Sequence, residues 1–191
     1  MSLAIFILPE GALRAELVRW KKRVKNELPD QPYTAHPPHI TLINLDVRNE
    51  KTGLDSVSAF SGSVDPFEIS VNRTDVFWDD TATGGHTLYF GIEKNDDLHA
   101  LQKSLANSLQ EVKKNISPPD YLTGNKQLLE SYERYGFPFM GDHWIPHFSV
   151  SSLRTEKTHP IIRDFLSSTE QYHFLVNQIS LWRGVDDKHT Q

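Results

Sequence analysis

Two five-residue segments of the same design stand 108 positions apart in this chain. They are Pro38–Leu42 (Pro-His-Ile-Thr-Leu) and Pro146–Val150 (Pro-His-Phe-Ser-Val). In a β-strand, side chains at positions i and i+2 project from the same face. Each histidine should therefore stand beside its hydroxyl residue, with the apolar residues turned to the opposite, packed face. Because proline can open a strand but does not sit in its middle, both segments are predicted to begin strands.

The rest of the chain repeats one order of elements. Apolar residues recur at helical spacing or alternate as in strands. The predicted elements, in order, are strand Leu3–Leu8, helix Ala12–Leu28, strand His39–Leu45, helix Glu50–Phe60, strand Phe67–Trp78 with a bulge, strand His86–Ile92, a helix from N-cap Asp96 to Val112, short helix Lys126–Tyr135, strand His147–Leu153, helix His159–Leu166 and strand Tyr172–Trp182. Both halves thus read strand, helix, histidine strand, helix, strand, a repeat of architecture rather than of sequence.

This order predicts an α+β fold of duplicated β-α-β-α-β units. We expect one bilobal domain over residues 1–191, with halves of roughly 1–80 and 86–191 related by a pseudo-twofold axis, and two sheets with antiparallel strands around a central groove. Whether the terminal strands are exchanged between the lobes stays open. The symmetry would bring the two histidine strands together across the groove.

Composition narrows the class of partner. The chain has 191 residues, 38% of them apolar, which suffices for a real core. Its net charge of −5 argues against a protein that grips long duplex nucleic acid, but permits a small anionic substrate or a strand end. There is no cysteine, and the apolar run near the first residue is too short for a signal peptide or a membrane span. We expect a cytoplasmic monomer without a membrane partner.

Two histidines and two hydroxyls suit phosphodiester chemistry. A neutral imidazole can accept a proton from water or a ribose hydroxyl, and an imidazolium opposite can protonate a departing alkoxide. The hydroxyls of Thr41 and Ser149 can donate hydrogen bonds to the non-bridging oxygens of a phosphate. Such a set calls for no metal, cofactor or covalent intermediate.

At these residues the chain resembles the two-histidine (2H) phosphoesterases, which include 2'-5' RNA ligase-like proteins and cyclic phosphodiesterases. The likeness depends on the paired His-apolar-(Ser/Thr)-apolar segments. Three predicted strands agree with it: the opening strand, which ends in Leu8-Pro9, the strand Thr87–Gly91 between the motifs, and the closing strand Phe174–Trp182. The resemblance implies hydrolysis of a 2',3'-cyclic phosphate or a 2',5'-type phosphodiester on a nucleotide or RNA end. It also implies that His39 and His147 are the acid and base, and that Thr41 and Ser149 bind the phosphate.

Two other functions stay open. A nucleotide or RNA-end binding protein could keep the pocket without turnover. A zinc hydrolase is suggested by the spacing of His36 with His39 and of His143 with His147, although prolines within both intervals disfavour the helix that such spacing needs.

Further side chains are candidates for substrate contact. The flanking histidines could line the groove or lie in solvent, the aromatic residues could stack on a base or pack in the core, and the arginines could pair with a second phosphate or sit on the surface. These candidates are His36, Tyr89, Arg134, His143, Trp144 and Arg183. The long, aromatic-rich connection 115–145 could likewise supply a stacking wall or a satellite hydrophobic cluster.

Overall fold

The computed structural model describes residues 1–61, 65–168, 170–185 and 188–190. Its elements are β1 (Ser2–Ile7), α1 (Gly11–Glu27), β2 (Ile40–Asp46), α2 (Glu50–Ser61), β3 (Phe67–Asp80), β4 (Gly85–Ile92), α3 (Asp96–Ser108), the 3₁₀ turn η1 (Asp120–Leu122), α4 (Lys126–Tyr135), the 3₁₀ turn η2 (Gly141–His143), β5 (His147–Leu153), α5 (Pro160–Leu166), β6 (Tyr172–Val176), β7 (Ser180–Val185) and β8 (Lys188–Thr190).

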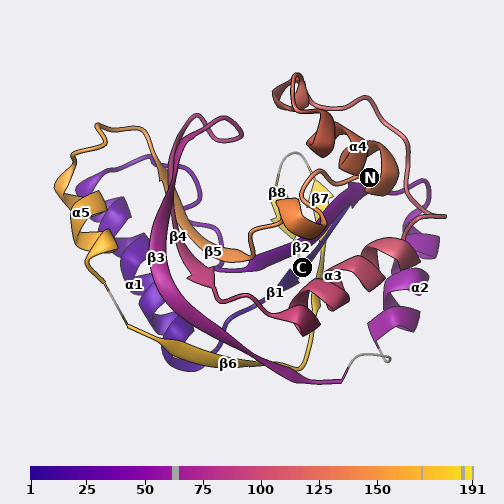
Figure 1. Cartoon of the computed structure of the whole chain (residues 1–191), viewed down its shortest axis with the longest axis horizontal. Helices are drawn as coiled ribbons and strands as arrows, with labels where there is room; N and C mark the ends of the chain where they lie inside the picture. The colour runs from indigo at the N-terminus through magenta and orange to yellow at the C-terminus, as the bar shows by residue number, and fades with distance from the viewer. Residues whose placement is uncertain (62–64, 169, 186–187, 191) are drawn as a thin grey trace.

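The strands form two curled antiparallel sheets, as the α+β prediction requires (Figure 1). One has the order β2-β1-β7-β8 and the other β5-β4-β3-β6. The two histidine strands, β2 and β5, are each at the edge of a sheet, and these two edges contact each other. The sheets therefore meet along the strands that carry the motifs.

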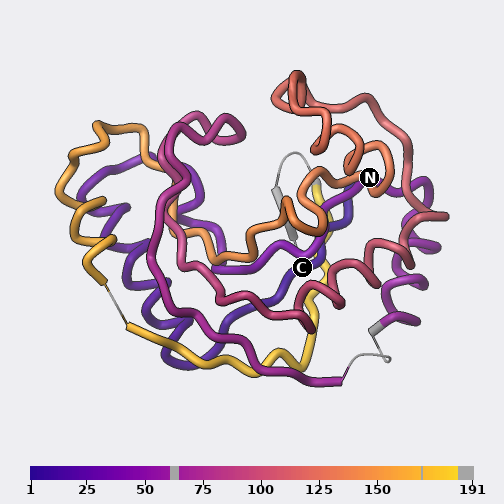
Figure 2. Tube along the Cα trace, viewed as in Figure 1, coloured from indigo at the N-terminus to yellow at the C-terminus, as the bar shows by residue number. Residues whose placement is uncertain are grey.

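The sheets do not follow the two halves of the sequence. Strand β3, from the first half, pairs with β4 and β6 in the second sheet, and β7 returns to pair with β1 in the first (Figure 2). The helices are exchanged in the same way, because α1 packs on β5 and β6 whereas α3 packs on β2. Each sheet thus contains strands from both 1–80 and 86–191.

Several elements differ from the prediction, among them helix α3, which ends at Ser108 and not at Val112. The segment Tyr172–Trp182 is two strands, β6 and β7, because the chain leaves one sheet and enters the other between them. Strand β8 was not predicted. Helix α3 is capped by Asn95, whose side-chain oxygen accepts a hydrogen bond from the N–H of Leu98 (2.8 Å), so Asp96 is its first residue. The predicted bulge in β3 is confirmed by register shifts after Val71 and after Phe77.

Buried side chains satisfy the carbonyls of the two edge strands. The indole N–H of Trp144 donates to the Thr41 carbonyl (3.1 Å), and the side-chain amide of Gln102 donates to that of Leu42 (3.1 Å). On the other edge, the Lys21 ammonium donates to the Val150 carbonyl (2.9 Å). Edges that would otherwise offer free hydrogen-bonding groups are thereby closed within the fold.

The connection 115–145 contributes to the main core. Phe137, Met140 and Trp144 belong to the large apolar cluster that fills the interior. For these three residues the structure favours packing over a stacking wall. In the part of the chain that is described, no helix has the length and apolar character needed to cross a membrane.

Candidate active site

The first motif lies against an aromatic pair on one face of the first sheet. His39 immediately precedes β2, and its ring stacks on that of Phe6, with 4.0 Å between centroids. Phe6 pairs with Thr41 across the β1–β2 ladder, so both side chains are on this face. Trp182 packs edge-on against Phe6 at 5.8 Å. The histidine is thus held by an apolar platform while Thr41 stays half-buried beside it.

The second motif has an equivalent aromatic setting. The ring of His147 makes edge contacts with Phe77 (4.9 Å) and Tyr89 (5.2 Å), which stack on each other at 4.0 Å. Tyr89 is paired with Ser149 in the β4–β5 ladder, and its hydroxyl donates to a carboxylate oxygen of Asp75 (3.0 Å). Three neighbouring strands therefore fix the surroundings of His147.

Both motif histidines are oriented by the same hydrogen bond. The Nδ1 of His39 lies 2.8 Å from the carbonyl oxygen of Pro37, and that of His147 lies 2.6 Å from the carbonyl oxygen of Ile145. A carbonyl can only accept, so in each ring Nδ1 carries the proton. When the rings are neutral, Nε2 is then the basic nitrogen in both. The two motifs match in tautomer as well as in sequence.

Burial sets the charge state of the second histidine. Desolvation lowers the pKa of His147 below its ordinary value, partly opposed by the Ile145 carbonyl and the Asp80 carboxylate. The neutral imidazole is therefore favoured near pH 7. Burial, together with the nearby Asp75, raises the pKa of Tyr89 to about 12, so its hydroxyl stays protonated.

Sequence patterns did not point to Arg73, which lies on the same face as His147. Arg73, Gly91 and His147 stand in line across three strands, since Arg73 pairs with Gly91 and Gly91 with His147. The arginine side chain lies over Gly91 so closely that a Cβ there would be 2.4 Å from its Nε. The missing side chain at position 91 allows the guanidinium to reach across β4 toward the second motif. Only the strand register reveals this.

Trp182, which the sequence placed at a strand end, was not among the predicted site residues. Its side chain is nine-tenths buried beside Phe6, and the buried indole N–H has no hydrogen-bond acceptor in the described structure. Buried donors are nearly always satisfied.

Two of the six further candidates lie beside the motifs. Tyr89 contacts His147, as described above. The His36 ring is 6.2 Å from that of His39, and burial together with the Lys21 charge lowers its pKa. Both therefore lie next to a motif histidine.

The other four lie elsewhere or are engaged in structure. Trp144 is buried and its indole N–H donates to the Thr41 carbonyl, so it stabilises β2 from the core side. Arg183 alternates with Trp182 to the opposite face of the sheet, where it pairs with Glu50 (2.5 Å). The guanidinium of Arg134 lies over the Tyr135 ring in α4, and His143 is exposed in η2 with no side-chain bond or ring contact among the described residues.

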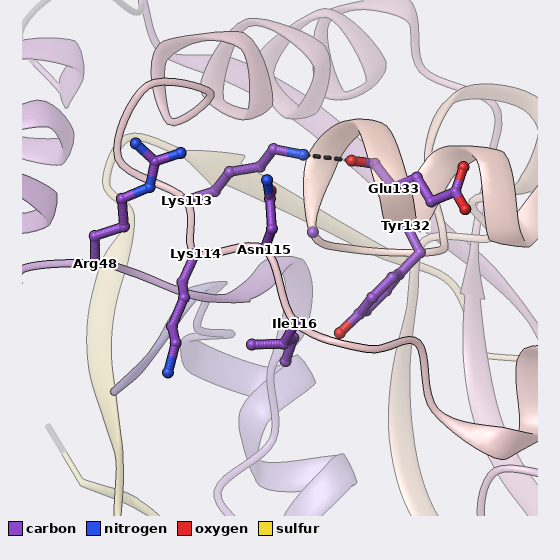
Figure 3. A pocket seen from close by; sticks show the side chains of 8 residues that line it. Arg48, Lys113, Lys114, Asn115, Ile116, Tyr132 and Glu133 are labelled. Carbon is purple, nitrogen blue, oxygen red and sulfur yellow. Dashed lines mark hydrogen bonds between the residues drawn. The ribbon is translucent and has the colours of Figure 1, made fainter.

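Two pockets flank the elements that carry the motifs. One, of about 490 Å³, is bounded by the loop His36–Pro38 and by α1. The other, of about 320 Å³, lies between Arg48 in the segment before α2, the segment after α3, and α4. Figure 3 shows its basic wall of Arg48, Lys113 and Lys114, with the Lys113 amine on the Glu133 carbonyl. No motif residue lines this second pocket. Among the described residues, no three histidine, aspartate or glutamate side chains gather as a metal-ion site.

Comparison with known proteins agrees with the fold. The family model described as the 2'-5' RNA ligase superfamily matches residues 9–188. TT0787 of Thermus thermophilus is similar with a TM-score of 0.61 at 19% identity, over 96% of this chain and 88% of that one.

E. coli LigT in its apo form gives a TM-score of 0.57 at 12% identity, over 99% of this chain and 91% of that one. LigT complexed with NADP+ gives 0.51 at 11% identity, over 98% and 91%. No curated protein sequence matched. Because the family model spans nearly the whole chain, this protein belongs to the 2'-5' RNA ligase superfamily of two-histidine phosphoesterases.

Proposed function

We propose that this protein is a metal-independent phosphodiesterase in which His39 and His147 act as acid and base on a 2',3'-cyclic phosphate or a 2',5'-type phosphodiester of a nucleotide or RNA end. The observation that carries the proposal is the matched orientation of the two histidines. Each ring is held through Nδ1 by the carbonyl two residues before it, so each has Nε2 as the nitrogen for proton transfer.

For a cyclic phosphate, one water and two proton transfers complete the reaction. The neutral His147 takes a proton from water as its oxygen attacks phosphorus. The bond from phosphorus to one ribose oxygen breaks, and protonated His39 gives its proton to that oxygen. The product is a phosphomonoester with a free hydroxyl, and the histidines have exchanged charge states. Proton exchange with solvent restores them.

The assignment of His147 as base rests on its environment. Burial lowers the pKa of its ring, which favours the neutral form that accepts a proton. His39 has a different environment, because its ring stacks on Phe6, and it is assigned the role of acid.

The negative charge on the phosphate oxygens is stabilised by hydrogen-bond donors. The hydroxyls of Thr41 and Ser149, each on the same face as its histidine, are proposed as the ligands of the non-bridging oxygens. Arg73 is proposed as an additional cation for the same group, because its side chain crosses Gly91 toward His147. The LigT complex with NADP+ shows that a protein of this fold can bind a nucleotide, which supports the substrate class.

The test is turnover of a substrate panel in the presence of EDTA. The panel comprises the four 2',3'-cyclic nucleotides, ADP-ribose 1'',2''-cyclic phosphate and 2',5'-oligoadenylate. Wild type is compared with His39→Ala, His147→Ala and the matched control His143→Ala, which removes an exposed histidine. We expect product from one class, lost by a factor of about 10² or more in the two motif variants and kept in the control.

Two results would decide against the proposal. Activity that disappears with EDTA and returns with zinc would indicate a metal hydrolase. Nucleotide binding without product, unchanged in His39→Ala, would indicate a binding protein.

A further inference from the structure

The pocket beside His36 opens onto one face of helix α1. Its volume of about 490 Å³ is bounded by Leu8 and Pro9 just after β1, by the loop that carries His36, and by the helix. Leu8 also packs against the Phe6–Trp182 cluster, on which His39 stacks. The His36 ring lies 6.2 Å from that of His39. The pocket is thus adjacent to the first motif.

Helix α1 has three faces with different tasks. Its apolar face packs into the core through Leu13, Leu17, Trp20 and Val24. A second face carries Arg19 and Arg23, which are bonded to Glu16, Glu27 and Asp164. The third face lines the pocket and presents Arg14, Val18, Lys21, Lys22 and Lys25. These positions recur at the spacing of one helical side.

The cations of this third face are not neutralised. Among the described residues, Arg14, Lys22 and Lys25 are exposed and form no ion pair, whereas the arginines of the second face all do. The pocket contains one carboxylate, that of Glu10, which accepts a hydrogen bond from Gln178 (3.1 Å). An acidic chain of net charge −5 therefore concentrates unpaired positive charge beside its motif. Such a wall attracts anions.

We propose that this pocket binds the phosphates of a single-stranded RNA that are adjacent to its terminal phosphate, so that an oligonucleotide is a better substrate than a free nucleotide. This rests on the proposed function for the position of the terminal phosphate. A polynucleotide whose end occupies the motifs has its next phosphates close by, and the row of cations along α1 follows such a backbone. Arg14, Lys22 and Lys25 are the phosphate contacts. Lys21 is not, because its ammonium is held by two backbone carbonyls.

The experiment measures binding of a fluorescent RNA hexanucleotide with a 3'-phosphate at 50 to 200 mM salt. The test variant is Arg14→Gln/Lys22→Gln/Lys25→Gln. The control, Arg19→Gln/Lys51→Gln/Lys126→Gln, removes three exposed, ion-paired cations and gives the same net charge. Each lost contact to a single strand should flatten the slope of log K against log salt by about 0.7, so the test variant is flatter by about 2 and binds about tenfold or more weakly.

A second arm separates this site from the catalytic one. The kcat/KM for a 2',3'-cyclic mononucleotide should stay within about twofold in the test variant, while that for a hexanucleotide ending in the same group falls. Equal losses in the control, or hexanucleotide binding by the test variant as in wild type, would overturn the inference. If wild type turns over neither substrate, the proposed function fails, and the binding arm still decides whether the pocket holds RNA. The single variant Lys25→Gln should flatten the slope by about 0.7.

Discussion

Lys21 connects helix α1 to the loop before the first motif and to the last residue of the second motif. It is 5% exposed, and its ammonium donates to the carbonyls of Tyr33 (2.8 Å) and Val150 (2.9 Å). Tyr33 is in the loop before the first motif, and Val150 ends the second. Desolvation lowers the pKa of Lys21 from 10.5 to about 8. Replacing it with methionine removes both the donor and the buried charge.

The two effects oppose each other near neutral pH. Two hydrogen bonds from a charged donor contribute about 3–6 kcal/mol, and the depressed pKa corresponds to a cost of about 3 kcal/mol for keeping the charge buried. Lys21→Met should therefore lower the free energy of unfolding by about 0–3 kcal/mol at pH 7. The unfolded chain keeps its proton up to about pH 10.5, whereas the folded chain releases it near 8, so wild-type stability rises with pH across this window.

The difference between wild type and Lys21→Met should thus increase by about 2 kcal/mol from pH 7 to pH 9.5. Urea denaturation at both pH values measures it, because titrations elsewhere cancel in the difference. Lys22→Met, which removes an exposed ammonium one position along the helix, is the control and should stay within about 0.5 kcal/mol of wild type at both. A difference for Lys21→Met that does not change with pH would refute the buried charge.

Three further outcomes follow from the site. Trp144→Phe should lower the free energy of unfolding by about 1–2 kcal/mol and reduce kcat, because the Thr41 carbonyl loses its hydrogen-bond donor. Urea denaturation measures the first effect and turnover the second. An unchanged kcat would contradict the role of this hydrogen bond in positioning the first motif. The acid limb of kcat/KM should lie below pH 6.5, because burial lowers the pKa of His147; a limb above pH 7 would exclude His147 as base. Gly91→Ala should reduce kcat/KM, because the added methyl group displaces the Arg73 side chain. In a protein that already carries Arg73→Gln, the same change should cause no further loss. Steady-state kinetics of the two single variants and the double variant measure this.

Local patterns predicted the elements well because their signals are local. The periodicity of α1 and the Pro-His openings of both motif strands depend on a few neighbouring residues, and the structure has those elements within one or two positions. The segment Tyr172–Trp182 is different. Its apolar alternation continues across the point where the chain changes sheets, so the sequence pattern does not reveal the change.

The surroundings of the motifs depended on contacts between distant strands. Arg73 reaches toward His147 only because β3 and β5 flank β4 in a particular register with glycine between them. Arg183 was a reasonable phosphate ligand by residue type, but alternation from Trp182 turns it to the other face. An amphipathic stripe likewise shows that a helix is buried, and not on which sheet. That α1 covers the second sheet therefore came from the structure alone.

The relative position of the two motif histidines depends on how the edges of two sheets meet. No backbone ladder joins β2 to β5 among the described strands, so side chains from other elements set their separation. Trp144 and Gln102 hold carbonyls of β2, and Lys21 holds one of β5. Each of these bonds spans at least 60 positions of sequence. Acid and base must act on one phosphate together, so small shifts between the sheets should affect turnover before they affect folding. These three buried side chains should therefore be as important to catalysis as residues that touch the substrate.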